Sequence, residues 1–406
     1  MEEVCRVNKT MKPDITLIFP TSLFLINQTT FPPLGIMYLS AYLRMHGFNV
    51  QCLDFGFGHT KEMAEADIIG ISFCTSQRHE AYKLVDYYKG KGCTTIAGGP
   101  HPTHMTDECI DNGFDWVIKG YGEENLAWIM GKNIIATKDV DNYPFPDRDS
   151  LPIKDYNYKI DGECATTIMT SRGCSYSCSF CAKIDNSFEM QSAERTISEI
   201  EHIYDRYGIK AFMIFDDVFI ADKRRLNKLT DAFYNSRYKF RCFARSNLID
   251  ENVCSMLSRM GVVEVGIGIE SGSDKILKLN RKNATSAHNT KAVEMLHKYG
   301  IRVKAFLIVG LPGEDHYTIS ETEKWIIRAK PDDIDVTVFQ PLPGSDIFAN
   351  PDKYGVKFDY KTSTGWFKGI PGKYDSNVST ERLNSWDIVE YRDMLEKCYK
   401  DVERIK

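Results

Sequence analysis

The first third of the chain alternates short apolar runs with segments of helical periodicity. The apolar runs are short enough to be buried strands, and they lie at 14–20, 50–54, 67–73, 94–97 and 116–118. Between the first two, Leu34, Met37, Tyr38 and Ala41 recur at the spacing of one helix face. Gly47 follows them, as is typical of a helix C-terminus. This strand–helix alternation predicts a parallel, doubly wound α/β sheet of Rossmann-like type.

The same alternation resumes on a larger scale between residues 164 and 340. Six apolar runs predict strands at 166–170, 211–215, 240–245, 263–269, 303–309 and 334–339. Helical periodicity appears between them, at 193–207, 251–260, 286–299 and 319–329. Six strand–helix units in succession predict an incomplete parallel barrel, a partial (βα)6 barrel of the TIM type.

The remaining segments have a different character. Residues 131–163 contain prolines among many Asp and Tyr residues and show no periodicity, which indicates a linker. The tail opens with prolines and ends in an amphipathic segment near 385–404, which indicates a short C-terminal helix. We expect four parts: a Rossmann-like domain at 1–130, the linker at 131–163, the partial barrel at 164–340 and a C-terminal extension at 341–406.

Composition and charge narrow the class of protein. The chain has 406 residues and a net charge of −5, which argues against a general nucleic-acid grip because that needs a basic face. Its 12 cysteines follow no repeating framework, as is typical of a reducing compartment. The charged start does not resemble a signal peptide, and no apolar stretch approaches membrane-spanning length. We expect a soluble, cytoplasmic enzyme without a membrane partner.

Three cysteines, Cys174, Cys178 and Cys181, form a C-x-x-x-C-x-x-C triplet. Thiolates at this spacing can reach three corners of a [4Fe–4S] cluster from one loop. Such a cluster normally takes four cysteines, so a triplet with no obvious fourth leaves one iron open to bind a small molecule. The triplet follows the first predicted barrel strand, and it therefore lies at the carboxyl ends of the strands, the catalytic face of such barrels.

Two other interpretations of the triplet are open. A structural zinc site needs a second pair of Cys or His, and the stretch to Lys210 offers only His202. Three buried thiols could instead pack as small hydrophobes, although Ser175, Ser177 and Ser179 are too polar for a core segment. An iron–sulfur loop fits the residues better than either alternative.

Further motifs surround the triplet in a fixed order. They are PPLGIMYL at 32–39, GGPHPT at 98–103, FDDVF at 215–219, GIESGSD at 268–274 and GLPGE at 310–314. With the triplet, they resemble the radical S-adenosylmethionine (SAM) superfamily, and the N-terminal sheet resembles that superfamily's class with a cobalamin-binding domain, whose members include methyltransferases. The resemblance covers residues 14–400. The glycine-rich motifs are weak individually, and their order and spacing carry the resemblance.

The resemblance implies a radical-generating site in the barrel. Cys174, Cys178 and Cys181 would hold the cluster, and the amino and carboxylate groups of SAM would bind the open iron. One electron would then cleave SAM to methionine and a 5′-deoxyadenosyl radical, which abstracts hydrogen from substrate. Residues implied in SAM binding are Phe180, Asp216, Arg245, Gly268, Glu270, Ser271, Gly310, Pro312 and Gln340.

Structural roles are open for several of these residues. Phe180 could anchor the cysteine loop instead of packing on adenine. Glu270, implied as the acceptor of both ribose hydroxyls, could form a buried salt bridge. Ser271 is a good helix-capping residue. Asp216 is followed by Asp217, and one of these acids could face the active site or the pair could serve the N-terminus of the next helix. Arg245 suits a carboxylate such as that of SAM.

The same resemblance implies cobalamin on the N-terminal sheet, contacted by Thr75, Ser76, Gly98, Gly99 and Pro100. The sequence departs from this pattern in two places. The loop at 19–33 lacks the D-x-H-x-x-G motif whose His binds cobalt, and His59 lies at the wrong spacing to replace it. Only twelve residues separate Asp54 from Asp67, which is too short for the usual helix. We therefore expect cobalt without a histidine ligand, or a platform that no longer binds it.

Three functional hypotheses follow. The first is cobalamin-dependent methylation of an unactivated carbon, with SAM as the source of both the methyl group and the radical. The second is non-methylating radical chemistry on the same architecture, such as cyclisation, ring contraction or oxidation. The third, from another class, is a non-catalytic metal protein that binds a partner. An enzyme would need an external reductant such as flavodoxin or ferredoxin, and its substrate would be a small molecule or peptide that no motif identifies.

Overall fold

The structure is a computed structural model, and it describes residues 12–22, 25–132, 139–184, 187–361 and 374–403. Contacts divide the chain into two compact units. The described part of unit 1 lies within Met1–Thr21, Pro33–Lys138 and Asn142–Ile153, and that of unit 2 within Ser22–Pro32, Asp139–Asp141 and Lys154–Lys406. The segment predicted as a linker is thus shared between the units, and the four predicted boundaries stay a prediction.

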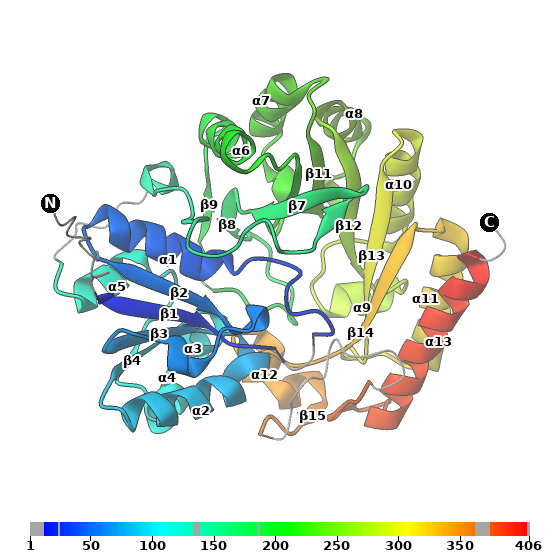
Figure 1. Cartoon of the computed structure of the whole chain (residues 1–406). Helices are drawn as coiled ribbons and strands as arrows, with labels where there is room; N and C mark the ends of the chain where they lie inside the picture. The colour runs from blue at the N-terminus through cyan, green and yellow to red at the C-terminus, as the bar shows by residue number, and fades with distance from the viewer. Residues whose placement is uncertain (1–11, 23–24, 133–138, 185–186, 362–373, 404–406) are drawn as a thin grey trace, which may run out of the picture. The chain divides into compact units, whose positions relative to one another are not determined.

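Unit 1 is a five-stranded parallel sheet with helices on both faces (Figure 1). In spatial order its strands are β2 (Val50–Asp54), β1 (Ile15–Phe19), β3 (Ile68–Ser72), β4 (Thr94–Gly98) and β5 (Trp116–Val117). Its helices are α1 (Leu34–Met45), α2 (Arg78–Lys89), α3 (Pro100–His104), α4 (Thr106–Asp111) and α5 (Glu123–Ile129). The predicted doubly wound sheet is confirmed.

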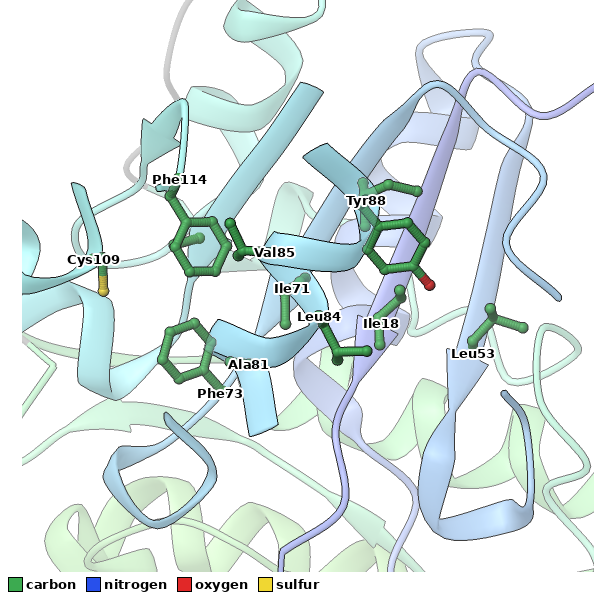
Figure 2. Close-up of a cluster of buried hydrophobic side chains, with 12 residues drawn as sticks. Ile18, Leu53, Ile71, Phe73, Ala81, Leu84, Val85, Tyr88, Cys109 and Phe114 are labelled. Carbon is green, nitrogen blue, oxygen red and sulfur yellow. The ribbon is translucent and has the colours of Figure 1, made fainter. Parts of the chain in front are cut away.

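One face of this sheet is packed by α2. Ala81, Leu84, Val85 and Tyr88 recur along α2 at helical spacing, and all four side chains are buried. They join Phe73 and strand residues in one apolar cluster, which Figure 2 shows. This packing fixes the start of α2, and with it the loop that leaves the carboxyl end of β3.

The connection from β2 to β3 is short, as the sequence indicated. It contains two 3-10 turns, η1 (Phe55–Phe57) and η2 (Lys61–Met63), and no α-helix. The ring of His59 accepts a hydrogen bond from the backbone N–H of Asp54 through Nδ1, at 2.9 Å. His59 therefore stabilises this turn locally.

Unit 2 is built on a seven-stranded sheet that curls into a partial barrel with helices outside it (Figure 1). In spatial order its strands are β14 (Asp333–Val338), β13 (Arg302–Val309), β12 (Val262–Glu270), β11 (Lys239–Ala244), β10 (Ala211–Ile214), β7 (Glu163–Ile168) and β6 (Lys159–Ile160). Its longer helices are α6 (Ala193–Tyr207), α7 (Lys223–Phe233), α8 (Glu251–Met260), α10 (Ser286–Lys298), α11 (His316–Ala329) and α13 (Ser385–Glu403). The strands from β7 to β14 are parallel, so the predicted partial (βα)6 barrel is confirmed.

The barrel strands alternate buried and half-buried residues. On β13, Val303, Ala305 and Leu307 are buried, whereas Lys304 and Phe306 between them are only half-buried. Side chains of successive residues point to opposite faces of a strand, so the buried set lies under the helices and the other set lines the inner face. The barrel therefore presents partly accessible side chains on its inner face.

Several short elements were not predicted. β6 pairs with β7 as an antiparallel hairpin, and two further hairpins join β8 (Ser171–Gly173) to β9 (Phe188–Met190) and β15 (Val356–Phe358) to β16 (Val378–Thr380). The short helices α9 (Asp274–Leu279) and α12 (Asp346–Ala349) lie beyond β12 and β14. In the part of the chain that is described, no helix has the length and apolar character to cross a bilayer.

Candidate active site

The cysteine loop begins directly after β8, at the carboxyl end of β7, and three backbone contacts hold it. The N–H of Ser179 donates to the carbonyl of Asn280 at 3.1 Å, and the carbonyl of Ser179 accepts from the N–H of Ile347, also at 3.1 Å. Lys183 Nζ donates to the carbonyl of Cys174 at 2.7 Å. Two distant segments, at Asn280 and Ile347, and the neighbouring Lys183 therefore fix the path of the loop.

The three thiols lie close enough to influence one another. Cys174 and Cys178 are partly buried and Cys181 is exposed. Surrounding protein atoms raise the pKa of Cys181 to about 12, and the charges of Cys178, Asp217 and Cys174 add to that rise. Thiolates gathered in this way need a cationic partner, which an iron–sulfur cluster provides, so the donor set fits one. Among the residues described, no group of three His, Cys, Asp or Glu converges on one metal-ion position.

Arg245, at the end of β11, braces the cysteine loop. Its guanidinium stacks 3.7 Å from the ring centroid of Tyr176, and Nη1 lies 3.6 Å from Cys178 Sγ. Nη2 donates to the carbonyl of Lys282. In this structure the guanidinium holds the cysteine loop, and the predicted contact of Arg245 with the SAM carboxylate stays a prediction.

Glu270 forms a buried ion pair with Lys282. Lys282 Nζ lies 2.5 Å from Glu270 Oε1, and both side chains are buried. Glu270 has a backbone φ of +62°, and the register between β12 and β13 shifts beside it. A Cβ at Gly268 would lie 2.3 Å from Glu270 Oε1 and 2.7 Å from Lys282 Nζ, so a side chain there would displace the pair. The structure therefore contains the buried salt bridge that the sequence analysis left open as an alternative role for Glu270.

The turn after β13 is organised by a buried acid. Glu314 Oε2 accepts the N–H groups of Gly310, at 2.7 Å, and Leu311, at 3.2 Å. Burial raises the pKa of Glu314 to about 8. Asn280 joins this turn to the cysteine loop, because its Nδ2 donates to the carbonyl of Pro312 and its Oδ1 accepts from Ser179 Oγ. The predicted residues Gly310 and Pro312 thus lie near the triplet.

Gln340 follows β14 and carries a buried amide. Its side chain is 6% exposed. Neither Oε1 nor Nε2 has a hydrogen-bond partner among the described residues. Orphaned atoms of this kind are rare in native proteins and indicate a missing ligand or water. A SAM molecule, which has donors and acceptors along its length, fits such a site.

Two other predicted residues are occupied by structural contacts. Asp216 is buried and accepts hydrogen bonds from both the N–H and the Oγ1 of Thr170, at 2.6 Å each. Ser271 is fully buried, with its Oγ 3.2 Å from Thr322 Oγ1. Phe180 is half-buried. Their roles toward SAM stay predictions.

Two residues of this region, Lys282 and Asn280, were not selected by the sequence analysis, which also left the choice between Asp216 and Asp217 open. Lys282 and Asn280 lie in a polar turn after α9, where no apolar period or motif distinguishes them. Of the acid pair after β10, Asp217 is the exposed member and the one whose charge acts on Cys181. Strand alternation predicts that only one of two adjacent acids faces inward, but not which one.

In unit 1, two loops meet at the carboxyl ends of β3 and β4. The N–H of Phe73 donates to the carbonyl of Gly98 at 3.1 Å, and a Cβ at Gly99, where φ is +100°, would lie 2.9 Å from the carbonyl oxygen of Phe73. A Cβ at Gly98 would meet no heavy atom within 4 Å. Open space over one glycine and a tight turn at the next leave room for a ligand on these loops, and this fits cobalamin.

The other predicted residues of these loops include Thr75, which is buried, and Ser76, whose Oγ lies 3.1 Å from Cys74 Sγ. Pro100 is exposed and begins α3. The structure brings all five predicted residues to the same edge of the sheet, where open α/β sheets bind their ligands.

A chain of hydrogen bonds leads from the buried Thr75 and His101 to the half-buried Tyr82 and Glu108. Tyr82 OH donates to Glu108 Oε1 at 2.9 Å, His101 Nε2 lies 3.1 Å from Tyr82 OH, and His101 Nδ1 lies 3.2 Å from Thr75 Oγ1. Because the Tyr82 hydroxyl donates its hydrogen bond to the Glu108 carboxylate, its oxygen accepts from the Nε2–H of His101. Nδ1 of His101 then accepts from the hydroxyl of Thr75. Burial, with Arg78 nearby, lowers the pKa of His101 to about 3.

The fold and the site define a class of enzyme in which a partial barrel holds an iron–sulfur loop and a separate Rossmann-like unit carries glycine-rich loops. Two family models match the chain. The radical SAM superfamily model matches residues 168–326, and the B12 binding domain model matches residues 28–129. The chain therefore carries a radical SAM domain and a B12-binding domain, as the motifs predicted. It is a radical SAM enzyme, and the cofactors of its two domains are a [4Fe–4S] cluster, SAM and cobalamin.

Relatives and solved structures agree with this assignment. An uncharacterized methyltransferase of Pyrococcus horikoshii is 26% identical over 96% of this chain and 92% of its own length. The anaerobic magnesium-protoporphyrin IX monomethyl ester cyclase of Rubrivivax gelatinosus is 23% identical over 78% of this chain and 66% of its own. The radical SAM methyltransferase TsrM of Kitasatospora setae, solved with cobalamin and a [4Fe–4S] cluster, has the same fold, with a TM-score of 0.68, 16% identity, and coverage of 88% of this chain and 82% of its own.

Proposed function

We propose that this enzyme cleaves SAM reductively and methylates an unactivated carbon of its substrate with the help of cobalamin. The observation that carries the proposal is the presence of both sites in one chain, the cysteine loop of unit 2 and the glycine loops of unit 1. The methyltransferase name of a relative that spans nearly the whole chain supports methyl transfer.

In this proposal Cys174, Cys178 and Cys181 hold the cluster, and Thr75, Ser76 and Gly98–Pro100 hold cobalamin. When bound, the cluster supplies the electron that splits SAM, and cobalamin carries the methyl group. The chain's own residues bind these groups and orient them. Arg245 keeps the cysteine loop in place, and the neighbouring Lys282 sets the position of the Glu270 carboxylate, which is proposed to accept the ribose hydroxyls.

The turn at 310–314 and the residues Gly268, Phe180 and Gln340 are proposed to enclose the nucleoside of SAM. Gly268 leaves the space that the Glu270–Lys282 pair occupies. Asp217 is exposed at the carboxyl end of a barrel strand, where catalytic residues of such barrels lie. It is available to contact a substrate or to accept a proton there.

The test uses the full chain with its cluster reconstituted under anaerobic conditions. It is incubated with hydroxocobalamin, a strong reductant and SAM labelled in its methyl group. We expect 5′-deoxyadenosine and S-adenosylhomocysteine, with label recovered in the corrinoid fraction. Cys178→Ala abolishes 5′-deoxyadenosine, whereas Cys164→Ala, an exposed cysteine outside the triplet, retains it. A wild-type protein that binds no cobalamin and forms no S-adenosylhomocysteine overturns methyl transfer.

A second candidate function is radical chemistry without methyl transfer. The similarity to an anaerobic cyclase favours it. The same incubation separates the two functions, because the second yields 5′-deoxyadenosine without S-adenosylhomocysteine. With a substrate in hand, a gain of about fourteen mass units marks methylation.

Radical SAM enzymes need a reductant. We propose that a flavodoxin or ferredoxin reduces this one in the cytoplasm, and that the substrate is a small molecule or a peptide. Replacing the chemical reductant by reduced flavodoxin or ferredoxin in the incubation above tests the electron donor. Failure of both proteins to support 5′-deoxyadenosine formation contradicts it.

A further inference from the structure

Gln340 occupies a defined place at the carboxyl edge of the barrel. β13 and β14 pair in parallel up to Val309 and Val338, and the N–H of Phe339 then donates to the carbonyl of Val309 at 2.7 Å. Gln340 is the next residue, so its amide lies at the strand ends beside the turn that starts at Gly310. Asn280 links that same turn to the cysteine loop.

The amide of Gln340 differs from other buried glutamine amides of the chain. Gln77 Oε1 accepts from the N–H of Cys74 at 3.0 Å, and its Nε2 donates to the carbonyl of Pro20. Gln191 is paired through one atom only: its Nε2 donates to the carbonyl of Met169 at 3.3 Å, and its Oε1 has no partner among the described residues. Both polar atoms of Gln340 lack a partner within the described residues. Because an unpaired buried donor or acceptor is costly, this amide is arranged for a ligand rather than for stability.

We propose that Gln340 recognises the adenine of SAM through a paired hydrogen bond, and so determines which nucleobase the site accepts. A carboxamide offers one donor and one acceptor side by side in a plane. The methionyl carboxylate of SAM offers only acceptors and its ammonium only donors. The ribose hydroxyls can both donate and accept, but the proposed function assigns them to Glu270. Adenine is then the remaining group that presents a donor next to an acceptor, its amino group beside N1 on one edge and beside N7 on the other.

This inference rests on the proposed function only in that SAM must bind; it does not require methyl transfer. The binding measurement therefore uses the cluster-loaded protein without reductant, so that SAM stays intact. Equilibrium dialysis gives the dissociation constants of SAM, its 7-deaza analogue and its 1-deaza analogue for the wild type and for Gln340→Met. Methionine has a similar length and no amide.

For the wild type we expect one of the two analogues to bind about tenfold or more weakly than SAM, and its identity shows which edge of adenine is recognised. Gln340→Met is expected to bind SAM about 10- to 100-fold more weakly and to show no further loss with that analogue. The inference is overturned if Gln340→Met binds SAM like the wild type, or if the loss with the analogue persists in the variant.

A structural role is separated by thermal unfolding without SAM. Because the amide of Gln340 has no partner in the described part of the chain, Gln340→Met is expected to leave the unfolding temperature unchanged or to raise it. Gln77→Met is the matched control, since it removes a buried amide that is paired through both polar atoms, and it should lower the unfolding temperature while leaving SAM affinity unchanged. If Gln340→Met does not fold, Gln340→Asn keeps the amide but withdraws it by one methylene, and it must still weaken SAM binding. A wild type that binds no SAM overturns the proposed function together with this inference.

Discussion

Lys282 Nζ lies 2.5 Å from Glu270 Oε1, and the two side chains form a buried pair at the carboxyl end of β12. The pair exists because the short turn after α9 returns Lys282 to the strand end and because Gly268 has no Cβ to obstruct it. The carbonyl of Lys282 also accepts from Arg245, which contacts the cysteine loop. Arg245 therefore links the Glu270–Lys282 pair to the loop that is proposed to hold the cluster.

The first prediction concerns this pair. Glu270→Gln leaves the ammonium of Lys282 buried without its counter-charge, and we expect the free energy of unfolding to fall by about 3–5 kcal/mol. Urea unfolding monitored by circular dichroism measures the change. A decrease of less than about 1 kcal/mol in the free energy of unfolding would show that solvent already stabilises the charge of Lys282.

The double variant Glu270→Gln/Lys282→Met is the control for charge. It removes both ionic groups, so we expect most of the lost stability to return. Reductive cleavage of SAM should remain impaired, since the carboxylate proposed to bind the ribose is still absent. Recovery of both stability and SAM cleavage in the double variant would assign Glu270 a purely structural role.

The second prediction concerns Asn280, whose side chain bonds both Ser179 and Pro312. Asn280→Ala removes the donor to the carbonyl of Pro312 and leaves Ser179 Oγ only its bond to the backbone carbonyl of residue 280, so we expect about 1–3 kcal/mol of destabilisation together with faster loss of iron to a chelator. The rate is followed from the visible absorption of the cluster. Asn227→Ala, on the exposed face of α7, is the control and should change neither quantity measurably.

The sequence predicted the fold well because its signals were local. Every strand of the two parallel sheets longer than two residues was visible as an apolar run, and the turn at Gly310 was visible as a motif. The Glu270–Lys282 contact was not predicted, because it depends on a turn whose residues carry no period. The alternative of a buried salt bridge named the correct kind of interaction but not the partner.

The same limit explains the acid pair after β10. Asp216 and Asp217 are chemically identical, and the choice between them depends on whether the strand pleat continues past Ile214. The structure directs Asp216 to Thr170, so Asp217 is the accessible acid. Hydrogen-bond partners far apart in the sequence thus decide which residues of a motif remain available to a ligand.

The third prediction is a pH dependence that comes from His101. Its folded-state pKa is lowered to about 3 from 6.5, so the unfolded chain binds a proton more readily than the folded protein. The neutral ring therefore contributes stability above about pH 6.5 that is lost as the pH falls toward 3. We expect wild type to be more stable than His101→Gln at pH 7.5, and the difference to narrow by about 1.4 kcal/mol per pH unit below 6.5.

Tyr82→Phe is the matched control for that experiment. It breaks the chain of hydrogen bonds between Glu108 and His101 but adds and removes no group that titrates in this range. Its stability difference from wild type should be about 1 kcal/mol and nearly constant with pH. Urea unfolding at pH 5.5 and pH 7.5 distinguishes the two variants, and equal pH slopes for both would exclude His101 as the source.

The fourth prediction compares two adjacent glycines of the B12-binding unit. Gly99 has a φ of +100° and lies against the backbone of Phe73, so Gly99→Ala should lower the free energy of unfolding by more than 1 kcal/mol. A Cβ at Gly98 meets no protein atom within 4 Å, so Gly98→Ala should leave the stability of the cobalamin-free protein within about 0.5 kcal/mol of wild type.

The two variants should separate in a different way when cobalamin is added. If the open space over Gly98 is where the corrinoid approaches, the added methyl group of Gly98→Ala must weaken hydroxocobalamin binding about tenfold or more, because the clash is with the ligand alone. Spectrophotometric titration of the anaerobic protein measures the dissociation constant. An unchanged dissociation constant in a variant of unchanged stability would place cobalamin elsewhere on the unit and would remove Gly98 from its site.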